Sequence, residues 1–198
     1  PEQADALHQL ATDHRKLTLH RLDVTRENEI SALANELEGK PIDILINNAG
    51  VYFEKFLDED LANIDYDHWQ ETLRVNSLGP MRVSTAFTEH VARSERRLVV
   101  AITSHMGSIA EIGSPGSYAY RSSKAALNAA MKGLSLALQP RGIGVLMLHP
   151  GWVQTRMGGP GATLTTEASV NGMRKLVEGF RMRETGCFYR FDGSVIPW

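Results

Sequence analysis

The sequence of 198 residues has one cysteine, no long apolar run and no basic stripe. The single cysteine, Cys187, excludes an internal disulfide framework and fits a reducing compartment. No apolar stretch approaches the roughly 20 residues that a membrane-spanning helix requires. The net charge is −2, and the densest basic cluster, Arg93, Arg96 and Arg97, flanks the end of a predicted helix, where cations favour the dipole. We therefore expect a cytoplasmic protein with no nucleic-acid or membrane partner.

The sequence also lacks the patterns of two common catalytic classes. Its seven histidines are scattered without a spacing such as His-x-x-x-His, so we predict no metal site. A serine hydrolase places its nucleophile on a sharp turn flanked by glycines, and Ser104 has no such context. Metal-dependent and Ser-His-Asp hydrolysis are both excluded by these patterns.

Apolar patterning predicts strands that alternate with helices along the whole chain. The predicted strands cover residues 17–24, 42–46, 98–103 and 143–148, with a final strand and tail over 187–198. The predicted helices cover residues 27–37, 65–93 with a kink at Gly79-Pro80, 118–139 and 166–180. This alternation predicts a single α/β domain over 1–198, with a mostly parallel sheet and helices on both faces in three layers. In such sheets ligands bind beyond the carboxyl ends of the strands.

Tyr120 and Lys124 lie four residues apart in a predicted helix, so their side chains share one face. An ammonium near a phenol favours the phenolate and lowers its pKa. Such a tyrosine could give a proton to a carbonyl oxygen or take one from an alcohol. On spacing alone, an ordinary pair on a helix surface explains these residues as well.

Two polar residues lie where a catalytic side chain could be placed. Ser104 directly follows the predicted strand 98–103, although Ser108 is a nearby rival and serine often caps a turn. Asn76 lies inside the predicted helix 65–93, close to Gly79-Pro80, where its amide could hold a water molecule. An ordinary polar position on a long helix is the alternative for Asn76.

Two loops follow buried strands and carry small residues. Asn47-Asn48-Ala49-Gly50 follows the strand 42–46, and its glycine would allow the backbone to approach a flat cofactor. The segment from Pro150 to Thr155 follows the strand 143–148 and offers a hydroxyl from Thr155. Turns without a ligand remain an alternative for both loops.

In their order along the chain, these residues resemble the pattern of the short-chain dehydrogenase/reductase family. The resemblance rests on Asp23, Asn47 to Gly50, Asn76, Ser104, Tyr120 with Lys124, and Pro150-Gly151. The run His149-Pro150-Gly151-Trp152, the Met157-Gly158-Gly159 turn and the ending at Pro197-Trp198 are similar to the C-factor-like and sniffer-like carbonyl reductases. The resemblance implies a doubly wound, Rossmann-type sheet and an NAD(P)(H)-dependent oxidoreductase that interconverts a carbonyl and an alcohol.

The resemblance also implies a role for each matching residue. Tyr120 would be the general acid/base, Lys124 would bind the nicotinamide ribose and lower the Tyr120 pKa, and Ser104 would orient the carbonyl. Asn76 would hold the water of a proton relay through Lys124. The residues implied to bind cofactor, besides Tyr120 and Lys124, are Asp23 and Val24 at the adenine, Asn48, Ala49 and Gly50 at the adenosine side, and Pro150, Gly151, Val153 and Thr155 at the nicotinamide.

The subgroup favours NADP over NAD as cofactor and a small carbonyl or alcohol as substrate. The helices over 65–93 and 118–139 form the subunit interface in many relatives, so a homodimer is a further expectation. The likeness to C-factor keeps a second function open, that of a cofactor-binding signalling or regulatory protein.

The sequence departs from the family pattern in two places. The 16 residues from Ser104 to Tyr120 make a longer interval than is usual in the family. The first strand, the Gly-rich turn, a helix and the second strand of the family are absent from the sequence, and Pro1 falls about where the second strand would end. We expect the working protein to carry about 35 to 40 more N-terminal residues, since a strand-helix-strand unit has that length. A truncated, inactive fragment is the alternative.

Overall fold

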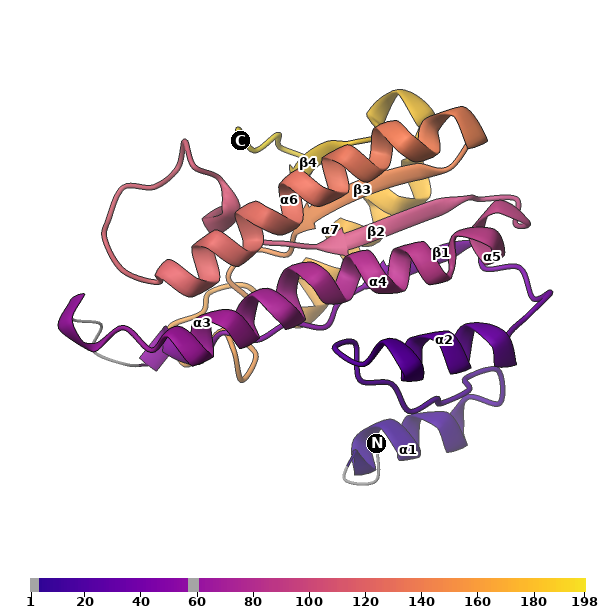
Figure 1. The fold of residues 1–198 in the computed structure, drawn as a ribbon, viewed down its shortest axis with the longest axis horizontal. Helices are drawn as coiled ribbons and strands as arrows, with labels where there is room; N and C mark the ends of the chain where they lie inside the picture. Colours follow the sequence, from indigo (N-terminus) through magenta and orange to yellow (C-terminus); the bar gives the residue numbers. More distant parts are fainter. Residues whose placement is uncertain (1–3, 57–60) are drawn as a thin grey trace.

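A computed structural model describes residues 4–56 and 61–198 and contains a parallel sheet of four strands. The strands are β1 (Ile44–Asn47), β2 (Leu98–Ile102), β3 (Gly144–His149) and β4 (Cys187–Arg190). They lie side by side in this order (Figure 1). The register aligns Ile44 with Leu98 and Leu98 with Gly144. The four predicted strands from residue 42 onwards are confirmed.

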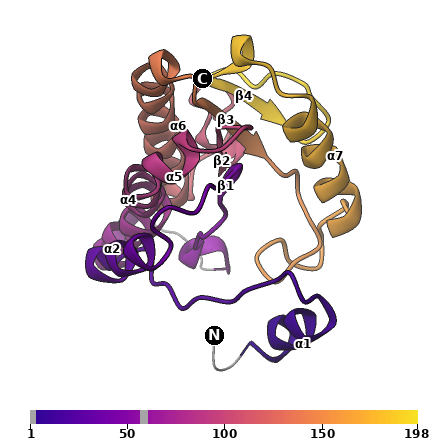
Figure 2. The same cartoon turned by 90° about the vertical axis from the view of Figure 1, so that its right-hand side faces the viewer.

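Helices cover both faces of the sheet. They are α1 (Asp5–Asp13), α2 (Glu27–Glu36), α3 (Tyr66–Leu73), α4 (Gly79–Ala86), α5 (Thr88–Ala92), α6 (Tyr118–Leu138) and α7 (Thr166–Gly179). Figure 2 shows α2, α4, α5 and α6 on one side of the strands and α7 on the other. The structure thus confirms the predicted three-layer, Rossmann-type arrangement. None of the helices within 4–56 and 61–198 has the length and apolar character needed to cross a membrane.

Two apolar cores separate the layers. On the α6 side, Val99 and Met147 of the sheet pack with Leu127 and Met131 of α6. On the α7 side, Leu146 and Leu148 belong to a second cluster with Val177 of α7. Successive residues of a strand point to opposite faces, so the apolar run of β3 supplies both cores. Because both faces of the sheet are packed, the strands and the loops that follow their carboxyl ends are held in place.

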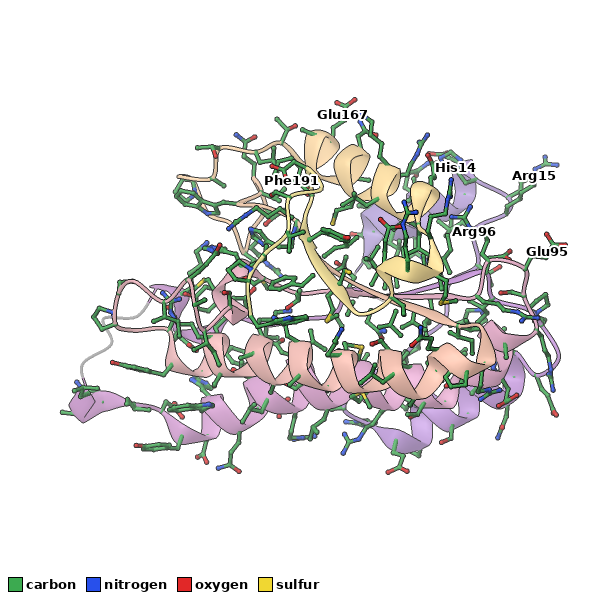
Figure 3. The ribbon with its side chains drawn as sticks, turned by 90° about the horizontal axis from the view of Figure 1, so that it is seen from above. His14, Arg15, Glu95, Arg96, Glu167 and Phe191 are labelled. Atoms are coloured by element: carbon green, nitrogen blue, oxygen red, sulfur yellow. The ribbon has the colours of Figure 1, made fainter. Side chains whose placement is uncertain are left out.

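Side chains at the ends of α3 and α7 define where these helices begin and end. Asp65 accepts a hydrogen bond from the His68 N–H at 2.9 Å, and Thr165 accepts one from the Ala168 N–H at 3.1 Å. At the other end of α7, the Arg96 guanidinium donates to the Val177 carbonyl oxygen at 2.7 Å. Figure 3 shows Glu167 and Arg96 near the two ends of this helix. Opposite charges at these ends complement the helix dipole.

The predicted helix over 65–93 is interrupted more often than expected. A π-helical turn, Arg74–Leu78, separates α3 from α4, and a further break at Phe87 separates α4 from α5. In the π turn the Gly79 N–H bonds to the Arg74 carbonyl five residues back. Pro80 has no N–H to offer the carbonyl four residues before it, so the wide turn replaces a regular one. The predicted kink therefore begins before Gly79-Pro80.

The predicted strand over 17–24 is wrong. Residues 17–23 have neither helix nor strand structure and 24–25 form a turn, while β1 pairs with β2 alone among the described strands. Leu22 and Val24 instead pack against a cluster built around Ile30 and Val83. Alternating apolar residues form a strand only where a neighbouring strand supplies hydrogen-bond partners. The helix α1 was also not predicted, and none of its residues is buried.

Candidate active site

A pocket of about 630 Å³ lies at the carboxyl ends of β1, β2 and β3. This is the edge at which the sequence predicted a ligand site. The lining residues are Asn48, Gly50, Tyr52, Lys55, Ile102, Thr103, Ser104, His105, Met106, Tyr120, Lys124, His149, Pro150, Gly151, Trp152, Val153, Thr155, Met157, Gly158, Thr166, Ser169, Val170 and Met173. The volume is in the range of sites for small molecules and cofactors.

Tyr120 and Lys124 both face this pocket from α6 and are almost fully buried, at 7% and 5% exposure. The Lys124 amine lies 5.8 Å from the centre of the Tyr120 ring. It donates a hydrogen bond to the carbonyl oxygen of Ile102, at the end of β2, at 3.1 Å. The alternative of a pair on a helix surface is therefore wrong for these two residues.

The acid-base properties of the pair differ from the sequence expectation. The pKa of Tyr120 is raised to about 12, chiefly by burial; a hydrogen bond with Ser104 acts to lower it, and the Tyr52 phenol and the Glu54 carboxylate act to raise it. Burial lowers the pKa of Lys124 to about 8. The predicted lowering of the Tyr120 pKa by the ammonium is wrong in this structure, because removal from water outweighs other influences. Tyr120 is consequently held as a neutral phenol, the form that can donate a proton.

Ser104 lies opposite Tyr120 at the start of the 3₁₀ turn His105–Gly107. Its hydroxyl accepts a hydrogen bond from the Met106 N–H at 3.1 Å, and it lies near enough to the Tyr120 phenol to lower the Tyr120 pKa. Ser104 thus caps a turn and contacts the candidate acid at the same time. The rival, Ser108, is fully buried and accepts from the Glu111 N–H at 3.3 Å, and it does not line the pocket.

Gly107 brings the turn after Ser104 into direct contact with α6. A Cβ atom at this glycine would lie 2.7 Å from the Lys124 carbonyl carbon and 2.9 Å from the Asn128 amide nitrogen. Only a residue without a side chain permits this approach. The contact sets the separation between Ser104 and the helix that carries Tyr120 and Lys124.

Asn76 is fully buried and joins the loop after β1 to α6. Its Oδ1 accepts from the Val51 N–H at 2.8 Å, and its Nδ2 donates to the Val51 carbonyl at 2.9 Å and to the Ser123 hydroxyl at 3.0 Å. Both amide hydrogens are thereby used within the protein. Oδ1 keeps one further lone pair for a water molecule. The role of Asn76 in a proton relay remains a prediction.

Most of the loop residues predicted to hold a cofactor meet at the pocket. Those that line it are Asn48, Gly50, Pro150, Gly151, Val153 and Thr155. A Cβ at Gly50 would lie 3.3 Å from Asn76 Oδ1 and 3.6 Å from the Lys124 amine, so the loop passes directly over both side chains. Asn47 turns away from the pocket and donates to the Ser84 hydroxyl at 3.0 Å.

Three of the predicted residues lie outside the pocket lining. Ala49 is exposed beside it. The Asp23 carboxylate accepts from the N–H and the hydroxyl of Thr25 and pairs with Arg26, which lowers the Asp23 pKa. Val24 packs against Gly79. The binding roles of these three residues remain predictions.

The sequence interpretation missed Tyr52, Lys55 and His149, which line the pocket, and Glu54, which contacts the Tyr120 backbone beside it. Tyr52 stacks on Tyr120 with ring centres 4.0 Å apart, and the Lys55 amine donates to the carbonyl oxygens of Met157 and Gly158. These contacts join segments more than 60 residues apart, so no local spacing could have revealed them. The His149-Pro150 junction at the end of a strand was the only available signal for His149.

His149 is a buried histidine at the end of β3, and it lines the pocket. Within the part of the chain that the structure describes, its Nδ1 has no hydrogen-bond partner. The His149 pKa is lowered to about 3, chiefly by burial; His105 and Arg190 also act to lower it, and Asp192 acts to raise it. The imidazole is therefore neutral at physiological pH.

A nicotinamide nucleotide fits these residues better than a metal ion does. Residues 4–56 and 61–198 contain no cluster of three or more potential metal ligands. The loop at Gly50 passes over the Lys124 amine, and Gly151, which has a φ of 86°, turns the loop after β3 at the pocket that Tyr120 and Lys124 also line. A lysine amine, a phenol and backbone turns at the carboxyl ends of parallel strands are groups that suit the ribose and base of a dinucleotide.

A model of the short chain dehydrogenase family matches residues 1–163. The chain belongs to this family. This short-chain dehydrogenase is also 43% identical to the C-signal protein of Myxococcus xanthus over 167 residues, which cover 84% of the chain and 99% of that protein.

Solved structures show the same likeness over the full chain. The carbonyl reductase Sniffer of D. melanogaster superposes with a TM-score of 0.93 at 30% identity, covering 100% of this chain and 84% of that one. The NADPH-bound carbonyl reductase from chicken fatty liver superposes with a TM-score of 0.91, with the same identity and coverage. The short-chain dehydrogenase is therefore an oxidoreductase of the C-factor and sniffer-like type.

Proposed function

We propose that this short-chain dehydrogenase reduces a small carbonyl compound to an alcohol with NADPH. The observation that carries the proposal is the buried triad of Tyr120, Lys124 and Ser104, which all line one pocket, with the Tyr120 phenol held neutral by burial. A neutral phenol beside a serine hydroxyl suits the donation of a proton to a carbonyl oxygen. NADPH or NADP in related structures supports the choice of cofactor.

Each residue of the triad has a separate part in this reaction. Ser104 holds the carbonyl oxygen of the substrate by a hydrogen bond. Tyr120 donates a proton to this oxygen as the oxygen gains negative charge. When bound, the nicotinamide supplies the hydride. Lys124, whose amine also contacts the Ile102 carbonyl, binds the ribose and returns a proton to Tyr120. Thr155 and Val153 hold the carboxamide from the loop that follows β3.

The test of the proposal is the substitution Tyr120→Phe in the intact protein. It removes the hydroxyl and keeps the ring that stacks on Tyr52. We expect kcat for any accepted aldehyde, ketone or quinone to fall by about 10²- to 10⁴-fold, the usual contribution of a general acid. The matched control is Tyr66→Phe, at an exposed tyrosine of α3. Unchanged turnover in Tyr120→Phe would remove the mechanism.

A second function, in signalling, is favoured by the identity to the C-signal protein. In that case the pocket would bind the nucleotide as a sensor. Calorimetric titration with NADPH and a turnover screen separate the two functions. Tight binding with no turnover of any carbonyl would favour the sensor.

The location and the assembly of the protein also stay proposals. Expression in a reducing cytoplasm suits the single cysteine, Cys187. A homodimer through α3, α4 and α6 is the arrangement that the sequence suggested, and sedimentation analysis of the intact protein tests it.

A further inference from the structure

The helix that carries Tyr120 begins without a cap from its own sequence. Ser117, the residue before α6, has a left-handed backbone with φ 56° and ψ 38°, and its side chain makes no capping hydrogen bond. The first N–H groups of a helix have no partner inside the helix. In α6 these belong to Tyr118, Ala119 and Tyr120, so the candidate acid lies in the part of the helix that is least fixed locally.

A carboxylate from a distant segment fills this position. Glu54 Oε1 accepts a hydrogen bond from the Tyr120 backbone N–H at 2.7 Å, across 66 residues of chain. Glu54 lies in the 3₁₀ turn Phe53–Phe56 and is only 8% exposed. A buried charge is costly unless it is well bonded, and a helix N-terminus provides both N–H donors and a favourable dipole. The Glu54 side chain is therefore tied to the start of α6.

The same segment also contacts the ring of Tyr120. Tyr52 stacks on this ring with centres 4.0 Å apart and planes 14° apart, and the Tyr52 hydroxyl is hydrogen-bonded to Ser117. The loop after β1 thus contacts the backbone and the ring of Tyr120 and also Ser117, the residue before α6. The Ser104 hydroxyl meets the far end of the same side chain.

We propose that Glu54 is a positioning residue for Tyr120, which fixes the first turn of α6 and so aims the phenol at Ser104. Glu54 acts through the Tyr120 backbone and not on the reacting atoms. The inference rests on the proposed function, in which Tyr120 is the proton donor.

The charge of Glu54 has a second consequence for the acid. A carboxylate near a phenol disfavours the phenolate, and Glu54 accordingly raises the pKa of Tyr120. The position and the charge of Glu54 can be separated by substitution. Glu54→Gln keeps an oxygen that can accept from the Tyr120 N–H and removes the charge, whereas Glu54→Ala removes both.

The experiment compares these two variants of the intact protein with wild type and with Glu89→Gln. Glu89 lies on α5 and pairs with Arg141, so Glu89→Gln changes the net charge equally without touching the pocket. Steady-state kinetics of carbonyl reduction are measured against pH, and hydrogen exchange of the Tyr120 amide is measured by NMR. The exchange measurement needs no turnover and therefore reports on the contact even if the protein is not a reductase.

We expect Glu54→Ala to lose about 10- to 100-fold in kcat with little change in KM, since a misaligned acid costs roughly this much. Its Tyr120 amide should exchange faster. Glu54→Gln should restore kcat at neutral pH and the slow exchange. In Glu54→Gln the decline of the reduction rate at high pH should begin at lower pH, because the acid loses its proton more easily.

Two results would overturn the inference. One is wild-type kcat and amide exchange in Glu54→Ala. The other is a Tyr120 amide that exchanges in wild type as fast as an amide open to solvent, because Glu54 would then not fix the first turn of α6, and this result decides the matter if Glu54→Ala does not fold. Absence of turnover in wild type, with Tyr120 exchange still dependent on Glu54, would instead refute the proposed function and leave the contact standing.

Discussion

The substitution Gly107→Ala adds one methyl group and should move Ser104 away from Tyr120. A Cβ there would lie 2.7 Å from the Lys124 carbonyl carbon, whereas ordinary contact begins at 3.4 Å. The 3₁₀ turn and α6 would therefore have to move apart by about 0.7 Å. Overpacking of a tight interior site costs about 1–3 kcal/mol of unfolding free energy. Displacement on this scale between Ser104 and Tyr120 should lower kcat by about 10²-fold.

The assay combines urea unfolding with steady-state reduction kinetics in Gly107→Ala and a matched control. Gly133→Ala makes the same change on the exposed side of α6, where a Cβ would meet no atom within 4 Å. Alanine is the better helix former, so this control should be more stable by about 0.5–1 kcal/mol with unchanged kcat. The reasoning would be refuted if Gly107→Ala kept wild-type stability and turnover.

Two further predictions concern pH. Burial lowers the Lys124 pKa to about 8, so between pH 8 and 10 the unfolded chain binds more protons than the folded one, and stability should rise with pH. Lys124→Met should abolish about 2 kcal/mol of that rise in urea titrations, and an unchanged rise would contradict the assignment. Burial lowers the His149 pKa to about 3, so stability should fall as the pH drops below 6.5, where the unfolded histidine takes up a proton. His149→Phe should recover about 2 kcal/mol of the loss between pH 6.5 and 5, and melting curves at both pH values would show whether it does.

Local patterns predicted the elements whose partners are close in the chain. The continuous apolar run of β3 and the Ala- and Leu-rich α6 were identified because burial on both faces and helical periodicity are visible in a short window. The strand predicted at 17–24 failed because pairing is not a local property. Alternation shows that a segment could pair, and says nothing about whether a neighbour is present.

The site was predictable to the same extent. The sequence could name Tyr120, Lys124, Ser104 and Asn76 because their order along the chain is a recognisable pattern. In the structure the first three line one pocket, and Asn76 lies directly behind Gly50, which also lines it. The Glu54 contact could not be foreseen, since it depends on a fold that brings two loops together. The direction of the Tyr120 pKa shift was also beyond the sequence, because burial is a property of the folded state.

The π turn at Arg74–Leu78 makes the length of this stretch as important as its composition. A π turn holds one residue more than the regular turn it replaces, and each residue advances a helix by about 100°. Deleting one residue of the π turn would leave a regular turn with α3 and α4 still in phase, but the Pro80 ring would then meet the carbonyl four residues before it. Inserting one residue would instead rotate α4 by about 100° relative to α3. Either Trp69 would leave its hydrogen bond with Ser122 on α6, or Val83 would leave the cluster under α2. We therefore expect insertions and deletions here to be tolerated far less well than substitutions of the exposed side chains.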